Sequence, residues 1–96
     1  MVNVLKLAPS TKFKKDLKRV TKQGKSRESI NNVIDKLQHQ EQLPQKNRDH
    51  ALIGEYKGYR ECHITSDWLL IYRIINDNSI GLLELTRTGS HAELFK

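Results

Sequence analysis

The segment YRECHITSDWLLIYRIIN, residues 59–76, decides the fold because it contains two strand patterns separated by a short polar turn. Successive side chains of an extended chain point to opposite faces. One face of the first pattern is polar and carries Tyr59, Glu61, His63 and Thr65. The opposite face carries Arg60, Cys62 and Ile64. The second pattern, Trp68–Asn76, is apolar on both faces and predicts a central strand covered on both sides.

Segments on either side supply the other strands of the expected sheet. Asn3–Leu7 alternates enough for a first strand, and the long segment 41–58 can hold a short strand near Leu52–Tyr56. The sequence NDNS at 76–79 predicts a hairpin turn, because Asn and Asp tolerate left-handed backbone conformations. The last strand should be Ser79–Thr88.

Two amphipathic helices are expected between the first strand and the long segment. The first begins near Thr11 behind the N-cap Ser10 and ends at Gly24, which tolerates a positive φ. Its apolar stripe consists of Phe13, Leu17 and Val20. The second begins behind Ser26 and ends near residue 39 or 40. Its stripe consists of Ile30, Val33, Ile34 and Leu37. Because the connecting turn is short, the two helices should form an antiparallel hairpin.

The end of the chain completes the prediction. Ser90 and Glu93 match a capping box, which places His91 in the first turn of a short helix. The predicted class is therefore α+β, with an N-terminal strand and a helical hairpin on a mainly antiparallel twisted sheet, followed by a short C-terminal helical turn. A chain of 96 residues without repeats should form one domain, residues 1–96.

Cysteine usage and the N-terminal sequence indicate a soluble cytoplasmic protein. Cys62 is the single cysteine, so it can form no intrachain disulfide and should be a small buried hydrophobe. The N-terminal apolar run is interrupted by Lys6 and is too short for a signal peptide or a membrane span. We therefore expect no membrane association.

Positive charge is concentrated at the start of the chain. Residues 1–27 hold nine Lys or Arg and one acid, Asp16, whereas residues 28–96 hold eight bases and ten acids. A surface polarised in this way attracts polyanions, which points to nucleic acid or an acidic protein partner. A lysine-rich helix that is merely solvated is the alternative.

Three of the four histidines fall where strand ends and loops should meet. His50 lies in the long segment, His63 on the polar strand face and His91 after the last strand, whereas His39 at a helix end is assigned no role. Histidine both accepts and donates a proton near neutrality, which suits RNA cleavage by the ribose 2′-hydroxyl. A half-solvated strand of an ordinary sheet is the alternative explanation of the polar face.

Metal and thiol chemistry are disfavoured by the sequence. The short ligand spacings that mark most zinc sites are absent, so we expect no metal and no cofactor, unless distant residues converge. Cys62 and His63 point to opposite strand faces, so a thiol–imidazole pair is not expected.

Two stretches, DHALIGEYKGYRECHITSDWLLIYRI (49–74) and LTRTGSHAELF (85–95), resemble a known family. They are similar to the YafQ branch of the RelE/ParE superfamily, the ribosome-dependent messenger-RNA endonuclease toxins of bacterial toxin–antitoxin pairs. The resemblance extends over the whole chain in order and spacing. It implies a helical hairpin on one face of the sheet and an active site on the other, concave face, which cleaves the codon in the ribosomal A site.

The resemblance also implies site residues. The catalytic positions of the family fall on His50, His63, Asp67 and His91. Trp68 and Phe95 match positions that contact substrate, and either ring, or Tyr59, could stack on a base. The residue pattern alone favours the alternative, in which each of these aromatic side chains belongs to the core. Glu61 is also expected to contact substrate, and it stands where the family has Asp, which keeps the charge but lengthens the reach.

Roles follow from the chemistry of phosphodiester cleavage. We expect His91 to protonate the leaving 5′-oxygen. His50 or His63, oriented by Asp67, should act as the base. Arg87 is expected to contact the phosphate, with a surface salt bridge as the alternative.

The basic first helix has two expected uses, contact with ribosomal RNA or docking of an acidic antitoxin. The residues concerned are Lys12, Lys15, Lys18, Arg19 and Lys22. Operator DNA is expected as a partner only through the antitoxin complex. Two other functions stay open: a non-enzymatic ParE-like inhibitor of a protein such as gyrase, and an RNA-binding module without catalysis.

Overall fold

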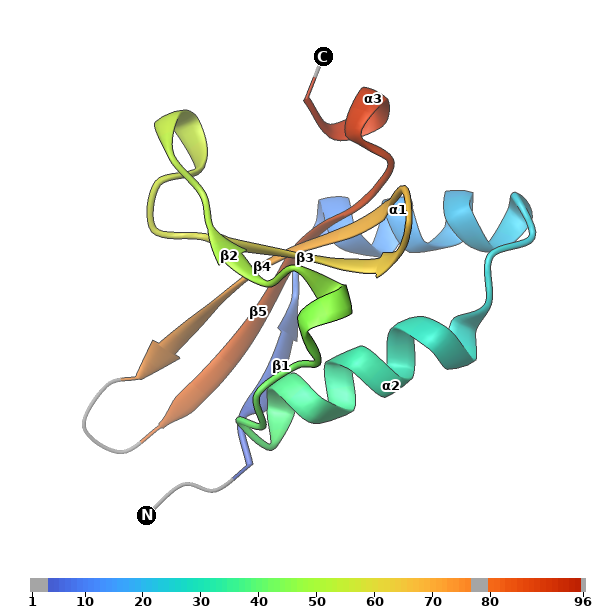
Figure 1. The fold of residues 1–96 in the computed structure, drawn as a ribbon. Coiled ribbons are helices and arrows are strands. Elements are labelled where there is room, and N and C mark those ends of the chain that lie inside the picture. Colours follow the sequence, from blue (N-terminus) through green and yellow to red (C-terminus); the bar gives the residue numbers. More distant parts are fainter. Residues whose placement is uncertain (1–3, 77–79, 96) are drawn as a thin grey trace.

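The computed structural model describes residues 4–76 and 80–95 and has two long helices on one side of a five-stranded sheet (Figure 1). The strands are β1 (Lys6–Pro9), β2 (His50–Ala51), β3 (Arg60–Thr65), β4 (Trp68–Asn76) and β5 (Gly81–Gly89). The helices are α1 (Thr11–Lys22), α2 (Arg27–Gln38) and α3 (His91–Leu94), and two 3₁₀ turns are η1 (Gln45–Asn47) and η2 (Gly54–Tyr56). The predicted α+β architecture is confirmed.

The sheet has the order β1-β5-β4-β3-β2, and every neighbouring pair is antiparallel except β1 with β5. Strand β4 lies at the centre, and its first five residues are buried, which explains why it is apolar on both faces. The register between β4 and β5 shifts between Ile71 and Tyr72. Such an irregularity bends a strand and increases its twist.

The main core lies between the sheet and helices α1 and α2. The hydroxyl groups of Ser10 and Ser26 accept hydrogen bonds from the first turns of the two helices, as predicted. The helices bury the side chains Phe13, Val20, Ile30, Val33, Ile34 and Leu37 in this core. The sheet contributes Cys62, Trp68, Leu70, Tyr72, Leu83 and Leu85. No helix among the described residues is long and apolar enough to span a bilayer.

Cys62 belongs to this core, as the strand pattern predicted. Its side chain is fully buried, and burial raises the pKa of the thiol far above its ordinary value. The thiolate form that a nucleophile needs is therefore inaccessible.

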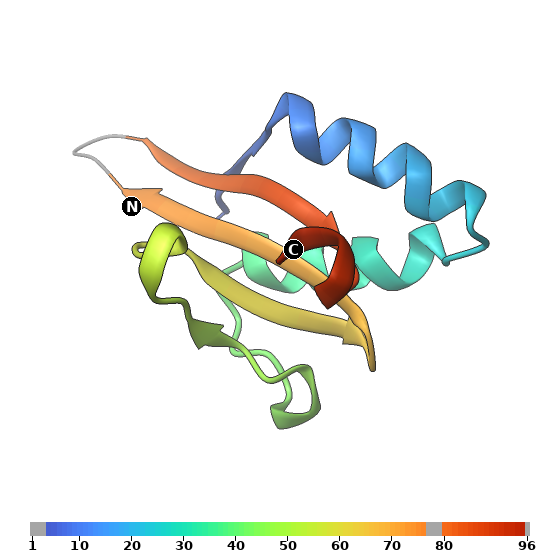
Figure 2. The ribbon, with the colours of Figure 1, turned by 90° about the horizontal axis from the view of Figure 1, so that it is seen from above.

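The opposite side of the sheet, which we call the open face, carries a second and smaller core. Leu69 and Ile71 of β4 contact Leu94 of α3, and Leu52, Tyr56 and Tyr59 pack against them. Figure 2 shows α3 in front of the sheet and α2 behind it. The small core therefore holds α3 and the η2 turn over the face that the long helices leave uncovered.

Several predicted boundaries are wrong. Strand β1 starts at Lys6, and Asn3 lies outside the described residues, as do residues 77–79 of the expected hairpin turn. The expected strand Leu52–Tyr56 is instead the η2 turn, because Gly54 adopts a positive φ of 70° and ends the extended chain. The short strand lies just before it, at β2.

Candidate active site

Three imidazoles surround one carboxylate on the open face. β2 and β3 pair so that His50 lies directly opposite Glu61, and His63 follows two residues later on the same face. The third, His91, comes from α3. The Nε2 atoms of the three rings lie 3.3, 3.9 and 4.0 Å from Oε2 of Glu61, in the order His50, His63 and His91. The fold thus brings together residues that are up to 41 positions apart in the chain.

The Nδ1 atom of each ring faces an oxygen. His50 Nδ1 lies 2.6 Å from the carbonyl oxygen of Arg48, and His63 Nδ1 lies 3.3 Å from that of Ser66. A carbonyl oxygen only accepts hydrogen bonds, so an Nδ1–H on either ring has an acceptor there, and Nε2 is turned toward Glu61. The two carbonyl groups therefore fix the orientation of both rings.

Asp67 orients a different histidine from the one predicted. Its Oδ1 atom lies 3.4 Å from both Nδ1 and the backbone nitrogen of His91. The imidazoles of His50 and His63 are instead held by backbone carbonyl groups. The expectation that Asp67 orients the base is therefore wrong, because the turn between β3 and β4 carries it to α3.

Glu61 is buried beneath the imidazoles that surround it. Its side chain is 4% exposed, whereas those of His50 and His91 are 51% and 55% exposed. Contact of Glu61 with substrate stays a prediction, and a ligand on the open face would meet the imidazole rings first. The carboxylate is placed to stabilise positive charge that develops on an imidazole.

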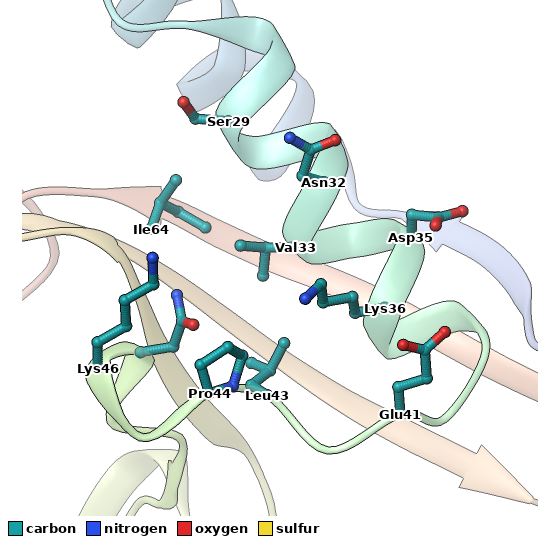
Figure 3. Close-up of a pocket in the computed structure, with 11 residues that line it drawn as sticks. Ser29, Asn32, Val33, Asp35, Lys36, Glu41, Leu43, Pro44, Lys46 and Ile64 are labelled. Atoms are coloured by element: carbon teal, nitrogen blue, oxygen red, sulfur yellow. The ribbon is translucent and has the colours of Figure 1, made fainter.

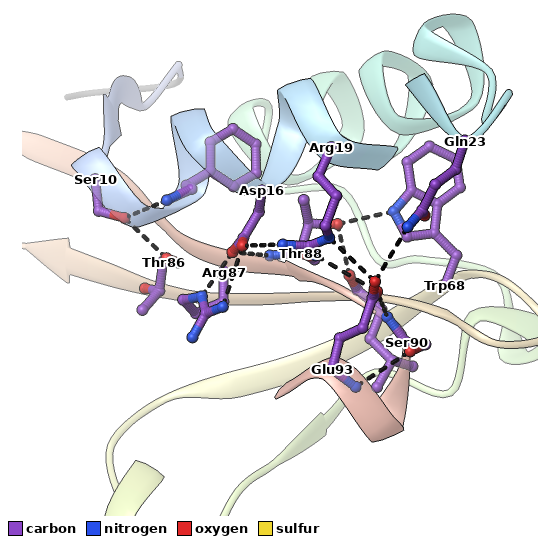
Figure 4. A network of polar contacts seen from close by, with 12 residues as sticks. Ser10, Asp16, Arg19, Gln23, Trp68, Thr86, Arg87, Thr88, Ser90 and Glu93 are labelled. Atoms are coloured by element: carbon purple, nitrogen blue, oxygen red, sulfur yellow. Dashed lines mark hydrogen bonds and ion pairs between the residues drawn. The ribbon is translucent and has the colours of Figure 1, made fainter. Parts of the chain in front are cut away.

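The position of His91 depends on a clamp that joins α3 to α1 (Figure 4). Ser90 and Glu93 form the predicted capping box, with the Ser90 backbone N–H donating to Glu93 Oε1 at 2.8 Å. Helix α1 grips the same carboxylate, because Gln23 donates to Oε2 at 3.2 Å and Arg19 to Oε1 at 3.4 Å. Backbone donation from Ser90 and the contact with Gln23 lower the pKa of Glu93. The carboxylate therefore holds the helix that carries His91.

Arg19 belongs to this clamp and also contacts β5 and its own helix. Its guanidinium also donates to the Thr88 carbonyl at 3.0 Å and to Asp16 at 2.7 Å. Contact of Arg19 with the ribosome or an antitoxin stays a prediction, and in the protein alone the side chain is held against β5 and α3. Gly89 leaves room for it, since a Cβ there would lie 2.6 Å from Nη2 of Arg19.

Arg87 forms an internal ion pair in place of a free phosphate contact. It donates to the two carboxylate oxygens of Asp16 at 2.6 and 3.1 Å. Burial alone would raise the pKa of Asp16, but the hydrogen bonds from Arg87 and Arg19 outweigh it and lower that pKa. The salt-bridge alternative is therefore correct for Arg87, although its acid is buried in α1 and not on the surface.

Of the two predicted substrate aromatics, one faces the site and one does not. Trp68 is 2% exposed and lies in the main core, where its indole N–H donates to Thr88 Oγ1 at 2.8 Å. It cannot stack on a base without leaving the core, so this prediction is wrong. Phe95 is 41% exposed, and its ring centroid lies 5.9 Å from that of His91.

Residues just before β2 shape the site and were missed by sequence reasoning. Arg48 is a non-glycine residue with a φ of 47°, which turns its carbonyl toward His50. Asn47 donates to the backbone carbonyl of His63 at 2.6 Å. Asp49 anchors the segment by accepting from Tyr72 at 2.5 Å and from Arg60 at 2.9 Å. The turn-forming residues Asn47 and Asp49 beside a histidine were the signal that could have indicated a built loop.

Two of the hollows that border this segment differ in their relation to the histidines. One of about 390 Å³ lies beside His63 and includes the cations Lys46 and Arg48, which places positive charge next to the imidazoles. The other, about 430 Å³, lies between α2 and the η1 segment, with Val33 and Leu43 among its lining residues (Figure 3). No histidine lines this second hollow, so it is separate from the site.

The cluster also has the composition of a metal site. One ligand atom each from Glu61, His63 and His91 lies within 4.8 Å of the others. Imidazole nitrogen and carboxylate oxygen are ligands for zinc and other transition metals. Sequence spacing gave no hint of this set because the three residues come from β3 and α3.

Comparison with known proteins agrees with this fold and identifies the family. A family model described as a bacterial toxin of type II toxin–antitoxin systems, YafQ, matches residues 5–96. The mRNA interferase toxin YafQ of Escherichia coli K12 is 37% identical over 87 residues, which cover 90% of each chain.

Solved structures agree as well. A metal-bound toxin from Helicobacter pylori superposes with a TM-score of 0.87 at 41% identity, covering 95% of this chain and 99% of the other. YafQ in the E. coli DinJ–YafQ toxin–antitoxin complex gives a TM-score of 0.83 at 35% identity, covering 96% and 98%. The chain therefore belongs to the YafQ family of bacterial type II toxins.

Proposed function

We propose that this protein is an endoribonuclease toxin that enters the ribosome, cleaves messenger RNA at the A-site codon and is neutralised by a cognate antitoxin. The observation that carries the proposal is the convergence of three Nε2 atoms on one buried carboxylate, at 3.3, 3.9 and 4.0 Å. Two of these rings are more than half exposed, so they can reach a bound phosphodiester. The mRNA interferase name of the E. coli relative supports the same reaction.

In the proposed reaction, His50 or His63 removes the proton from the ribose 2′-hydroxyl through Nε2. The 2′-oxygen attacks phosphorus, the bond to the 5′-oxygen breaks, and His91 donates a proton to that leaving oxygen. The products are a 2′,3′-cyclic phosphate and a 5′-hydroxyl. Glu61 stabilises the charge that forms on the base, and no metal is required for any step.

The arrangement of polar groups favours this enzyme over a non-enzymatic inhibitor of the ParE type. A binding surface gains nothing from a carboxylate buried under imidazoles, since buried charges are costly to keep. Each imidazole also has its Nδ1 atom placed against an oxygen. Positioned proton-transfer groups of this kind are what general acid–base catalysis requires.

Helix α1 provides the cationic surface for ribosomal RNA or for an acidic antitoxin segment. Its exposed lysines are Lys12, Lys14, Lys15, Lys18 and Lys22. Release of counterions from RNA by such a surface makes binding strongly dependent on salt. The DinJ–YafQ complex supports an antitoxin partner, and the site of action would be the cytoplasm, where ribosomes translate.

Cleavage of messages on purified programmed ribosomes, read by primer extension, tests the proposal. The His91→Ala variant should cut at least about a hundredfold more slowly, the usual cost of losing a general acid. His39→Ala is the matched control, because His39 is an exposed histidine at the end of α2, with its Nδ1 atom near the Asp35 carbonyl. Wild-type protein that leaves the message intact, or a His91→Ala variant as fast as His39→Ala, would refute the proposal.

A further inference from the structure

A continuous row of rings crosses the open face and begins with the imidazoles of His63 and His91. The ring of His63 lies 5.8 Å from that of His91, which lies 5.9 Å from Phe95. Phe95 in turn lies 5.8 Å from Tyr56, and Tyr56 lies 5.9 Å from Tyr59. The row therefore runs from His63 in β3, through α3 and the η2 turn, to Tyr59 just before β3.

Arg73 of β4 ends this row. Its guanidinium carbon lies 4.7 Å from the ring centroid of Tyr59, which is the geometry of a cation–π contact. Glu84 of β5 fixes the group by accepting from Nε at 3.2 Å and from Nη2 at 3.0 Å, and Thr86 holds Glu84 at 3.1 Å. The side chain of Arg73 is nevertheless 40% exposed. It is thus a rigid planar group with one side packed on a ring and part of its surface open.

We propose that Arg73, backed by Tyr59, is a stacking platform for an RNA base that neighbours the cleaved nucleotide. This inference rests on the proposed function, because it concerns the same RNA strand. Bases that leave a helical stack are held in proteins on aromatic rings and on arginine planes. Phe95 and Tyr56 continue the apolar surface between the platform and the imidazoles.

The distance between His63 and Tyr59, at the two ends of the row of rings, is long enough for more than one nucleotide. His63 and Tyr59 are four residues apart on an extended chain, which spans about 13 Å. Stacked bases of one strand repeat about every 3.4 Å, so the row is longer than a single base. A base seated on Arg73 would therefore belong to a different nucleotide from the one that is cut.

Charge indicates that the platform takes a base and not a phosphate. Glu84 accepts two hydrogen bonds from Arg73, so its carboxylate offsets the guanidinium charge and would repel a phosphate. Stacking needs no net charge and tolerates every base, and modest preferences arise because some bases stack more strongly than others. The platform is therefore a place where codon preference can arise.

The test compares cleavage by Arg73→Ala and wild-type protein on ribosomes programmed with messages that differ at one codon position at a time. Loss of the platform should slow cleavage about tenfold, within the range for removal of a stacking side chain, and should reduce discrimination between bases at one position. Arg27→Ala is the matched control, since Arg27 is an exposed arginine at the start of α2. Tyr59→Leu, with its thermal unfolding measured in parallel, removes the other half of the platform.

The outcomes separate this inference from the proposed function. If wild-type protein cuts and Arg73→Ala cuts equally fast with the same codon pattern, the platform is refuted and the nuclease stands. If wild-type protein does not cut, the nuclease is refuted, and binding of a fluorescent trinucleotide then decides the platform. The platform is refuted if wild-type protein and Arg73→Ala bind the trinucleotide with equal affinity, or if neither protein binds it.

Discussion

Nε2 of His50 lies 3.3 Å from Oε2 of Glu61, and the two residues face each other directly across β2 and β3. Strand β2 consists of only His50 and Ala51, so a two-residue ladder sets the position of a candidate base. Cross-strand neighbours in an antiparallel pair keep their side chains close together. The pairing of β2 with β3 is therefore as important for the site as the identity of the histidine.

Replacement of Glu61 by Gln should show how much the negative charge of Glu61, as distinct from its volume, contributes to cleavage. The amide has nearly the same volume, so the fold should persist, but charge on an imidazole would no longer be stabilised. We expect cleavage on programmed ribosomes to fall about a hundredfold, the usual effect of removing one electrostatic group from an active site. Circular dichroism and thermal unfolding provide the control, and an unchanged rate would remove Glu61 from the mechanism.

Asp16 should make the stability of the fold sensitive to acid. Its pKa is lower in the folded protein than in the unfolded chain, so it stabilises the fold above the unfolded value and loses this effect as pH falls through the folded value. Asp16→Asn should cost about 3 kcal/mol near neutrality, because Arg87 and Arg19 lose their acid.

Urea unfolding at a series of pH values from neutral to below the ordinary carboxyl range checks this prediction. The difference between wild-type protein and Asp16→Asn should shrink toward the acid end. A difference in the free energy of unfolding that stays constant with pH would contradict the assignment of Asp16.

The clamp on α3 should affect catalysis more than stability. Glu93→Ala removes the acceptor of Ser90, Gln23 and Arg19, and it should cost about 1 kcal/mol of stability, as for loss of a helix cap. Cleavage should fall about tenfold because displacement of a catalytic group is costly for rate. Glu28→Ala is the matched control, since Glu28 also lies in the first turn of a helix. Equal rates for the two variants would show that the clamp does not position His91.

Transition metals should inhibit the enzyme. A metal held by Glu61, His63 and His91 would take the imidazole lone pairs that proton transfer needs. Added zinc should therefore reduce cleavage, whereas 1,10-phenanthroline, which leaves ribosomal magnesium in place, should not. Loss of activity with the chelator, restored by zinc, would instead make the reaction metal-dependent.

Periodicity was sufficient to predict the elements that bury apolar side chains. Strand β4 occupies the predicted residues, and α1 and α2 begin at the predicted serine caps, because these patterns depend on local geometry. The alternation of side chains along β4 also predicts the side on which Trp68 lies, because Trp68 shares a face with Leu70 and Tyr72 in the main core. The family resemblance instead led us to expect Trp68 on the open face of the sheet.

Contacts between distant segments could not be predicted in the same way. Asp16 lies within the apolar stripe of α1, and only the fold shows that Arg87, 71 residues later, is its partner. The same limitation applies to Arg19, which lies among the lysines of a basic helix but contacts Glu93 of α3. Pairing of two residues from different elements depends on register and packing, and a single sequence specifies these only indirectly.

The attachment of α1 to α3 through Glu93 links the lysine-rich helix to His91, the proposed proton donor. A partner that pulled α1 away from β5 would withdraw the hydrogen bonds of Gln23 and Arg19 and let His91 drift from the substrate. A partner bound to α1 alone would then reduce cleavage without covering the proposed active site.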